Sequence, residues 1–454
     1  MKVFGSSGTR GVANEELTPS FVLNVAAAAG TVWRADRVAV ARDTRTTGKM
    51  LADAATSGLA SVGTDVDRLG VLPTPGAQAY AAREGVPAVM ITASHNPPRY
   101  NGVKLIGDDG VELSVADLER IEETMLAESA ERVQWDEVGS SRTVEGTRAD
   151  YVEGLLSAVD RDRIADAELT VALDPGHGAG TLTSPEFFRR LGCRVVGIND
   201  DPDGRFPGRD PEPVPANLDD LGRLVRATDA DVGIAHDGDA DRAIFYDETG
   251  EYVEGDATLA ALAAAELDRG DATVSAVNVS QRLVDVAADV GASLELTPIG
   301  STNIITRIKE LHAAGESVPI AGEGNGGIFF PDRLLARDGA YTAARFLELV
   351  ADRPVSDLVA PYDGYHNVRV NLEYESDAQR EAMVAAAESH ADDAGADLTT
   401  IDGYRLDYGD AWVLARPSGT EPLVRIYAEA RDRERAEALA AEARERLLAA
   451  REDA

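Results

Sequence analysis

The sequence is poor in cysteine and has no long apolar run. Its one cysteine, Cys193, excludes a disulfide framework and a metal site made of several thiolates, and we expect its side chain to be buried. No apolar run approaches the ~20 residues that cross a bilayer, and the first residues show no apolar segment typical of a secretion signal. These absences predict a soluble, cytoplasmic protein that does not act at a membrane.

Lysine is also scarce: only four of the 44 basic residues are lysine. Against these 44 stand 80 acidic residues, so the formal net charge is -36. Repulsion at such a charge loosens a fold in dilute buffer and is screened in molar salt, where the Debye length is about 3 Å. We therefore predict a halophilic protein, with an ordinary acidic cytosolic protein as the alternative. The negative charge also argues against nucleic acid as a partner.

The 454 residues exceed what one hydrophobic core accommodates, so several domains are expected. Three stretches share the order strand, loop, helix, glycine, strand, which is typical of layered α/β domains. The C-terminal part alternates like half-buried strands and ends in a long Ala/Glu/Arg helix. We predict three similar layered α/β domains followed by a smaller α+β domain, with the boundaries 1–147, 148–252, 253–360 and 361–454.

Residues 92–98 (TASHNPP) follow the short apolar run 88–91, which reads as a buried strand. Two prolines exclude a helix, so the segment leaves the strand as a stiff loop that presents Ser94 beside His95. A hydroxyl held in this way can act as a nucleophile or a phosphate carrier. The alternative is a polar turn that closes the strand.

Three aspartates, Asp237, Asp239 and Asp241, stand at alternate positions directly after another apolar strand. Carboxylates this close repel one another unless a cation lies among them. Mg²⁺ fits best, because it prefers oxygen ligands and commonly acts with phosphates. The alternative is a solvated acidic turn in an acidic protein.

Two further loops carry groups suited to a sugar phosphate. Residues 416–422 (RPSGTEP) bring guanidinium and hydroxyl groups together near a strand end, a combination that binds phosphate, although a decorated hairpin is the alternative. Residues 322–327 (GEGNGG) place Glu323 and Asn325 among glycines, where they can bind sugar hydroxyls. Arg10 lies in a glycine-rich loop. Lys104 follows residues 92–98, which we call the serine loop, and the alternative to a functional Lys104 is an ordinary surface lysine.

Together these segments resemble the α-D-phosphohexomutase family, and the form of the motifs in this chain is most similar to the family's archaeal branch. The motifs stand in the family's order and fall in all four predicted domains: residues 4–11, 92–98, 237–242, 322–327 and 416–422. The resemblance implies an intramolecular phosphotransferase that interconverts hexose 6-phosphate and hexose 1-phosphate. A phosphoserine enzyme and a hexose 1,6-bisphosphate, acting as intermediate and activator, are implied with it.

The resemblance also assigns roles to residues. It implies that Ser94 carries the phosphoryl group and that Mg²⁺ is bound by Ser94 with the three aspartates. The sugar and its non-reacting phosphate would contact Arg242, Glu323, Asn325, Arg416, Ser418, Gly419, Thr420 and Arg425. The other implied catalytic residues are Arg10, Lys104 and His95.

One position departs from the family pattern. Many bacterial members have a proton-transferring histidine where this chain has Gly327, which leaves Lys104 and His95 as candidate acid/base groups. Glucosamine 6-phosphate is the first expectation for the substrate, with glucose and mannose phosphates as alternatives; a homo-oligomer is left open. The rival interpretations are a metal-dependent phosphatase, a serine hydrolase, which lacks the G-x-S-x-G motif here, and a non-catalytic sugar-phosphate sensor.

Overall fold

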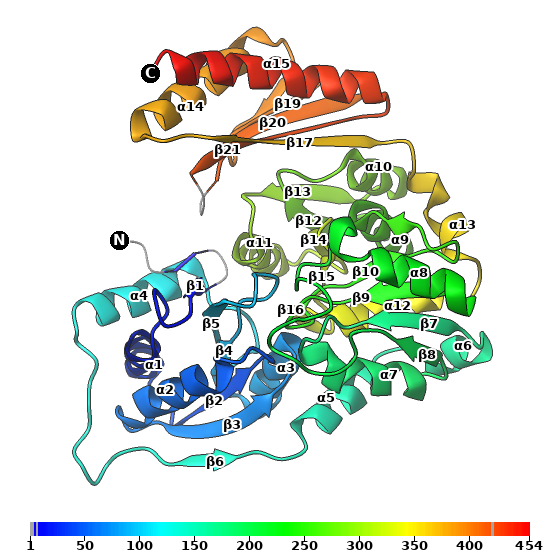
Figure 1. Cartoon of the computed structure of the whole chain (residues 1–454). Coiled ribbons are helices and arrows are strands. Elements are labelled where there is room, and N and C mark those ends of the chain that lie inside the picture. Colours follow the sequence, from blue (N-terminus) through cyan, green and yellow to red (C-terminus); the bar gives the residue numbers. More distant parts are fainter. Residues whose placement is uncertain (1–3, 6–7, 419–421) are drawn as a thin grey trace. The chain divides into compact units, whose positions relative to one another are not determined.

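The computed structural model describes residues 4–5, 8–418 and 422–454, and Figure 1 labels most of their helices and strands. The chain divides into two compact units: residues 1–262 with 319–360, and residues 263–318 with 361–454. Helix α9 (Gly255–Glu266) and the turn η3 (Ala360–Tyr362) lie where the chain passes from one unit to the other. The four predicted domain boundaries remain a prediction beside this division.

The first unit begins with a six-stranded sheet in the order β1-β5-β4-β2-β3-β6. Strand β2 runs parallel to β3 and β4, and β6 is parallel to β3, whereas β5 is antiparallel to both β4 and β1. The strands are β1 (Thr9–Val12), β2 (Arg37–Arg42), β3 (Asp65–Val71), β4 (Ala88–Ile91), β5 (Tyr100–Ile106) and β6 (Ser141–Thr143). The helices are α1 (Pro19–Trp33), α2 (Gly48–Ala60), α3 (Thr74–Glu84) and α4 (Val115–Leu126).

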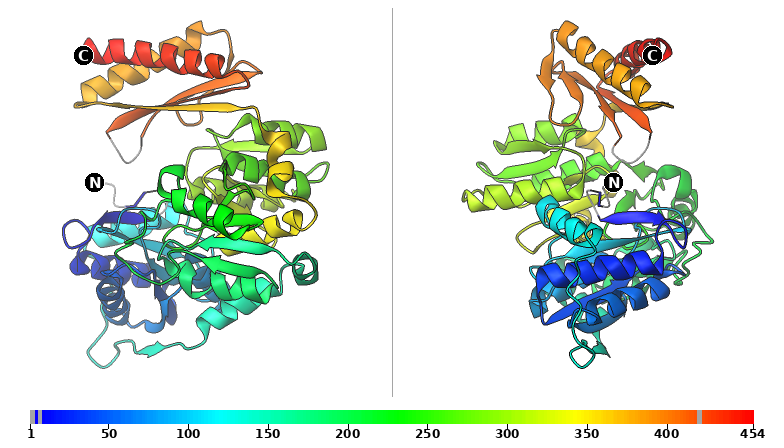
Figure 2. Two further views of the ribbon diagram at one scale, coloured as in Figure 1. Left: turned by 45° about the vertical axis from the view of Figure 1, so that its right-hand side comes forward. Right: turned by 90° about the vertical axis from the view of Figure 1, so that its left-hand side faces the viewer.

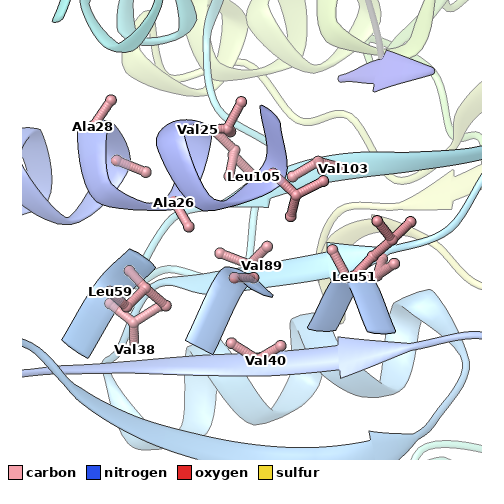
Figure 3. Packing of buried hydrophobic residues seen from close by; sticks show 14 of the residues in the cluster. Val25, Ala26, Ala28, Val38, Val40, Leu51, Leu59, Val89, Val103 and Leu105 are labelled. Atoms are coloured by element: carbon pink, nitrogen blue, oxygen red, sulfur yellow. The ribbon is translucent and has the colours of Figure 1, made fainter. Parts of the chain in front are cut away.

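The central strands β2 and β4 are buried on both faces, so this sheet has a hydrophobic cluster on each side. The Thr18 hydroxyl accepts a hydrogen bond from the Phe21 amide and Pro19 occupies the first turn, so α1 begins with a well-formed cap. Figure 3 shows side chains of α1, α2, β2, β4 and β5 gathered in one cluster, with Val25, Leu59 and Val89 among its fully buried members. Burial of such side chains against each other holds the sheet edge that carries the loops described below.

The second sheet of this unit has the order β11-β10-β9-β7-β8, with β7 parallel to β8 and β9 and antiparallel pairing beyond β9. Its strands are β7 (Thr170–Asp174), β8 (Arg194–Gly197), β9 (Val232–Ala235), β10 (Ile244–Tyr246) and β11 (Tyr252–Val253). Its helices are α5 (Thr147–Leu156), α6 (Arg161–Asp166), η1 (Ala179–Leu182), α7 (Ser184–Arg190), η2 (Pro215–Asn217) and α8 (Asp219–Thr228).

The first unit also contains an antiparallel run of three short strands and two helices. These elements are β14 (Ala321–Glu323), β15 (Gly327–Phe330), β16 (Leu334–Arg337), α12 (Gly339–Val350) and α13 (Val355–Val359). The second unit contains two parallel strands, β12 (Ala272–Ala276) and β13 (Ser293–Thr297), with α10 (Gln281–Val290) and α11 (Ser301–Ala313). Strands and helices thus alternate a third time along the chain.

The rest of the second unit is an antiparallel sheet in the order β17-β21-β20-β19-β18, packed against two long helices (Figure 2). Its elements are β17 (His366–Glu373), α14 (Asp377–Asp393), β18 (Asp397–Thr399), β19 (Tyr404–Asp407), β20 (Ala411–Pro417), β21 (Leu423–Ala430) and α15 (Arg433–Glu452). The predicted fold class, three α/β segments and a C-terminal α+β segment, is confirmed. In the described part of the chain, no helix is both long and apolar enough to span a bilayer.

Candidate active site

The serine loop connects β4 to β5 and places Ser94 inside the first unit, fully buried. Ser94 has a left-handed backbone with φ 51°, a conformation that residues other than glycine rarely adopt. Its hydroxyl lies 2.6 Å from the Asp237 carboxylate and donates to Oδ2. The structure therefore brings together Ser94, the predicted phosphate carrier, and residues 237–242, which we call the metal loop, although they are far apart in the sequence.

The metal loop connects β9 to β10 and carries three buried carboxylates: Asp237, Asp239 and Asp241. One oxygen from each lies within 4.8 Å of the others. Within the described residues, Oδ1 of Asp239 and Oδ1 of Asp241 are buried without a hydrogen-bond donor. Buried carboxylate oxygens without donors are costly unless a cation binds them, so this group fits a hard divalent metal ion.

Two carboxyl groups of the metal loop, Asp237 and Asp241, have pKa values shifted in opposite directions. Burial, together with repulsion from Asp241 and Asp239, raises the pKa of Asp237 to about 8. Burial also opposes the charge of Asp241, but the cations Arg337 and Lys104 outweigh it and hold the pKa of that carboxyl well below its usual range. A metal ion among the three carboxylates would remove the repulsion that Asp237 experiences.

The two loops approach each other closely because residue 238 is glycine. A Cβ atom there would lie 2.6 Å from the Ser94 carbonyl oxygen, closer than real Cβ contacts come. Behind the loop, the neutral His236 donates from Nδ1 to the Arg242 carbonyl (2.8 Å), and burial lowers its pKa. Arg209 donates to the His236 carbonyl at 2.6 Å and pairs with Asp174. The metal loop is thus held by its backbone from both sides.

Lys104 lies on β5 and points at the metal loop, with only 2% of its surface exposed. Its ammonium donates to Oδ2 of Asp239 (3.2 Å) and of Asp241 (3.0 Å), and Glu112 lies 3.8 Å away. Burial opposes its charge, but the three carboxylates outweigh burial and raise the pKa of Lys104 above its usual value. The alternative of a surface lysine is therefore wrong.

Arg10 and Arg242 place positive charge beside the serine loop and its residue His95. Arg10, on β1, donates to the Asn96 side chain at 2.7 Å. His95 Nδ1 lies 3.3 Å from Ser94 Oγ, and the guanidinium of Arg242, then burial, then Arg10 lower the pKa of His95. An imidazole in this field stays neutral, and the guanidinium groups remain as cations suited to phosphate oxygens.

Residues 322–327, which we call the glycine loop, form the turn between β14 and β15. They contact the end of the metal loop, where the Ala243 amide donates to the Gly326 carbonyl at 3.1 Å. Asn325 Oδ1 accepts from the Gly327 amide (3.0 Å), and its Nδ2 lies 3.4 Å from Glu323 Oε2. Both side chains are half-buried in the first unit. The Asn325 side chain thus bridges the Gly327 amide and the Glu323 carboxylate.

Arg337, at the end of β16, fills the space beside Gly327. A Cβ at position 327 would meet Arg337 Cδ at 2.8 Å. Its guanidinium donates to Asp241 Oδ2 at 2.7 Å, and Glu112 lies 3.9 Å away. Where the family pattern has a histidine, this chain therefore has an arginine side chain from a neighbouring strand.

The predicted phosphate loop belongs to the second unit. Arg416 and Arg425 are direct cross-strand partners on β20 and β21, and Asp402 lies 3.0 Å from Arg416 Nε. The Ser418 amide donates to the Leu423 carbonyl at 2.8 Å. Gly419 and Thr420 lie outside the described residues. Two arginines side by side on adjacent strands agree with a site for an anion.

Sequence reasoning missed several buried polar residues near Ser94 and the aspartates. They are Asp43, Arg45, Thr74, Thr92, Glu112 and Arg337. Thr74 donates to Asp239 Oδ2 at 2.5 Å, and Thr92 donates to Asp43 Oδ2 at 2.7 Å. Asp43 and Thr92 directly follow parallel strands, so the rule that ligands bind at the carboxyl ends of parallel strands would have selected them.

Comparison with known families decides the class of this arrangement. Residues 1–132, 149–250 and 254–365 match the phosphoglucomutase/phosphomannomutase alpha/beta/alpha domains I, II and III, and residues 367–446 match the C-terminal domain. The chain belongs to the phosphoglucomutase/phosphomannomutase family. The enzyme class expected from the resemblance, a hexose phosphate mutase, is thereby confirmed.

Individual relatives within this family match over nearly their whole length. A phosphoglucomutase/phosphomannomutase of Thermococcus kodakarensis is 40% identical over 445 residues, covering 96% of each chain. A "probable phosphoglucosamine mutase" of Methanopyrus kandleri is 41% identical over 443 residues, again with 96% of each covered. The crystal structure of a family protein from Burkholderia thailandensis is 28% identical, with a TM-score of 0.87 over 99% of this chain and 97% of that one.

Proposed function

We propose that this chain converts glucosamine 6-phosphate into glucosamine 1-phosphate through a phosphoserine at Ser94. The observation that carries the phosphoserine is the 2.6 Å contact between Ser94 Oγ and Asp237, inside a group of three buried carboxylates. The choice of glucosamine is supported by the similarity to relatives named probable phosphoglucosamine mutase. The Ser94 hydroxyl is buried at the carboxylates and not exposed to solvent, and a mutase needs a hydroxyl that can hold a phosphoryl group. Phosphoglucomutase or phosphomannomutase activity is the alternative.

The reaction consists of two phosphoryl transfers, which move two different phosphoryl groups. The bond from phosphorus to Ser94 Oγ breaks as a bond to the free sugar hydroxyl forms, and the hydroxyl proton passes to a base. The resulting 1,6-bisphosphate turns over, and its other phosphate returns to Ser94 Oγ while the released sugar oxygen takes up a proton. Lys104 and His95 are the two candidates for these proton transfers: the neutral His95 can accept a proton, whereas the protonated Lys104 can donate one. Exclusion of water would limit hydrolysis.

Phosphoryl transfer asks a protein mainly for positioning and for neutralisation of charge. Ser94, Asp237, Asp239 and Asp241 would hold Mg²⁺, which supplies positive charge for the transferring phosphoryl group. Arg10 and Arg242 would add guanidinium donors around the serine loop, in keeping with the Arg10–Asn96 hydrogen bond. Hexose 1,6-bisphosphate would act as activator, because it phosphorylates Ser94 in enzyme that has lost its phosphate.

The rest of the substrate would be bound by two separate loops. Glu323 and Asn325 would bind the sugar hydroxyls, supported by their mutual fixation at the β14–β15 turn. Arg416, Ser418, Gly419, Thr420 and Arg425 would bind the non-reacting phosphate, supported by the cross-strand pairing of the two arginines. Because the bisphosphate must react in both orientations, these loops would accept either phosphate.

The composition extends the proposal to the working conditions. With a net charge of -36 and four lysines, the enzyme would belong to a salt-adapted branch of the family and work in the cytoplasm at high salt. Small sugar phosphates would be its partners, with neither nucleic acid nor membrane among them, and association into a homo-oligomer stays open.

Turnover of three substrates tests this proposal. The enzyme is assayed in molar KCl with Mg²⁺ and a trace of glucose 1,6-bisphosphate on glucosamine, glucose and mannose 6-phosphates, and 1-phosphate formation and free phosphate are both measured. We expect the highest kcat/KM for glucosamine 6-phosphate and little free phosphate. A preference for glucose or mannose would transfer the proposal to the alternative, whereas stoichiometric phosphate release would indicate a phosphatase.

A further inference from the structure

A buried ion pair lies directly beneath the serine loop. Asp43 follows the last residue of β2, Arg45 comes two residues later, and both side chains are wholly buried. Asp43 Oδ2 accepts from Arg45 Nε at 3.0 Å, and Oδ1 accepts from the Arg45 amide at 2.9 Å. No step of the reaction above uses either residue.

The Arg45 guanidinium has five N–H donors, and the structure provides five acceptors. Nε donates to Asp43, Nη1 to the carbonyls of Pro97 (2.8 Å) and Tyr100 (3.0 Å). Nη2 donates to the carbonyls of Ser94 (2.8 Å) and Asn96 (2.7 Å). Since no donor remains for a phosphate, Arg45 acts on the backbone of the loop and not on the substrate.

Both peptide groups of Ser94 depend on this pair. The Ser94 carbonyl accepts from Arg45, and the Ser94 amide donates to the Thr92 hydroxyl at 2.9 Å. That hydroxyl in turn donates to Asp43 Oδ2 at 2.7 Å. A serine with φ 51° stays in this unfavourable conformation only when its surroundings enforce it.

We propose that Arg45, held by Asp43, is a positioning residue that fixes Ser94 Oγ at the metal loop during both phosphoryl transfers. The inference rests on the proposed function of Ser94. The Ser94 carbonyl held by Arg45 is also the atom that Gly238 approaches. A shift of the loop would therefore change the distance between Ser94 Oγ and Asp237, on which the transfer depends.

The informative variant is Arg45→Lys, because it keeps the charge opposite Asp43 but has three donors in place of five. We expect kcat to fall roughly 100-fold, the size of effect that a small misplacement of reacting groups produces. KM for the sugar phosphate should stay within about threefold, since only a step after binding is affected. Phosphorylation of Ser94 by glucose 1,6-bisphosphate in a single turnover should slow by the same factor as kcat.

Two further measurements separate positioning from a general loss of stability. In Arg45→Ala, added guanidinium ion at low concentration should restore part of kcat, and amides of residues 92–101 should exchange hydrogen faster than in wild type. The matched control is Arg405→Lys, which removes a buried guanidinium of the second unit that donates to the carbonyls of Val277 (2.6 Å) and Val279 (3.1 Å). It should lower Tm but leave kcat near the wild-type value.

The outcomes are distinct. If Arg45→Lys keeps the wild-type kcat, raises KM alone, or loses no more activity than Arg405→Lys, Arg45 is not a positioning residue. If wild type carries no phosphate on Ser94 and has no mutase activity, the proposed function fails instead. In that case the exchange of residues 92–101 still decides whether Arg45 holds the loop.

Discussion

At the scale of single residues, the metal loop has unsatisfied buried oxygen atoms. Oδ1 of Asp239 and of Asp241 lack donors within the described chain, while Oδ2 of both accepts from Lys104. One face of each carboxylate is therefore already neutralised, and the other face is open to a cation. This arrangement explains how three carboxylates can share one buried loop.

Metal binding should consequently stabilise the folded protein. Millimolar Mg²⁺ should raise the Tm of wild type, because an ion that binds only the folded state adds RT ln(1 + [L]/Kd) to its stability. Asp239→Asn should lose that increase. The control is Asp67→Asn, which removes a buried carboxylate paired with Tyr80 and Arg142 outside the loop and should keep the Mg²⁺-induced shift. An equal shift in wild type and Asp239→Asn, measured by calorimetry, would contradict the assignment.

Cys193 should be chemically inert in the folded protein. It is buried, as expected from the sequence, and burial, then Asp231, raise its pKa to about 12. Because the thiolate is the reactive form, we expect no reaction with a thiol reagent at pH 8 in high salt and one equivalent after unfolding. Rapid labelling of native protein at pH 8 would show that the thiol is accessible.

Among residues, the sequence was sufficient where a motif carried the chemistry and insufficient where a contact did. Ser94 and the aspartates stand in recognisable loops. Lys104 looked like a lysine that could equally lie on the surface, because its burial depends on Asp239 and Asp241, more than 130 residues away. Arg45 stands in no motif that suggests a role, and only the folded loop shows that four backbone carbonyls converge on it.

At the scale of elements, residues of β15 and β16 compete for one volume beside the glycine loop. Gly327 has room for no side chain because Arg337 occupies that volume, and Arg337 pairs with Asp241. A histidine at 327 and an arginine at 337 therefore exclude each other unless one of them moves.

This exclusion predicts a coupled effect on stability. Gly327→His should destabilise the protein by about 1–3 kcal/mol, the usual cost of overpacking. In an Arg337→Ala background the same change should cost less, with a coupling of about 0.5–3 kcal/mol between the two sites. Denaturant unfolding of the four proteins in high salt measures this coupling. Strictly additive effects would show that the two positions do not compete for space.

Most strands and helices that the periodicity predicts exist, and the exceptions have local causes. The second strand–helix–strand stretch predicts one helix between β7 and β8, but the chain forms the 3-10 helix η1 and then α7, with Pro185 in the first turn of α7. Proline favours a new helix start at that point and not the continuation of an earlier turn. The short strands β14 to β16 carry no periodic signal that distinguishes them from glycine-rich turns.

At the scale of the whole molecule, net charge should govern stability. At -36, mutual repulsion opposes folding, and salt screens that repulsion. We expect Tm to rise steadily from low to molar KCl. Sucrose, which stabilises by exclusion and does not screen charge, serves as the control and should have a much smaller effect in low salt. A Tm independent of KCl would contradict adaptation to high salt.

The number and class of domains could be predicted from the sequence, because alternating strands and helices are a property of the chain itself. The gathering of the site could not. Arg10, Ser94, Lys104 and the metal loop come from distant parts of the sequence, and only the topology of the two sheets in the first unit brings the relevant strand ends together. The family resemblance implied that these residues form one site, and the structure shows the contacts between them.

The central claim, that Ser94 carries the transferred phosphoryl group, is tested most directly by locating the phosphate. Dephosphorylated enzyme in molar KCl and Mg²⁺ is mixed with glucose 1,6-bisphosphate, and its peptides are analysed by mass spectrometry before and after a chase with hexose 6-phosphate. We predict one phosphate on Ser94 that is transferred to sugar in the chase, and neither phosphate nor turnover in Ser94→Ala. Turnover with no phosphate on Ser94, or an active Ser94→Ala enzyme, would contradict the account.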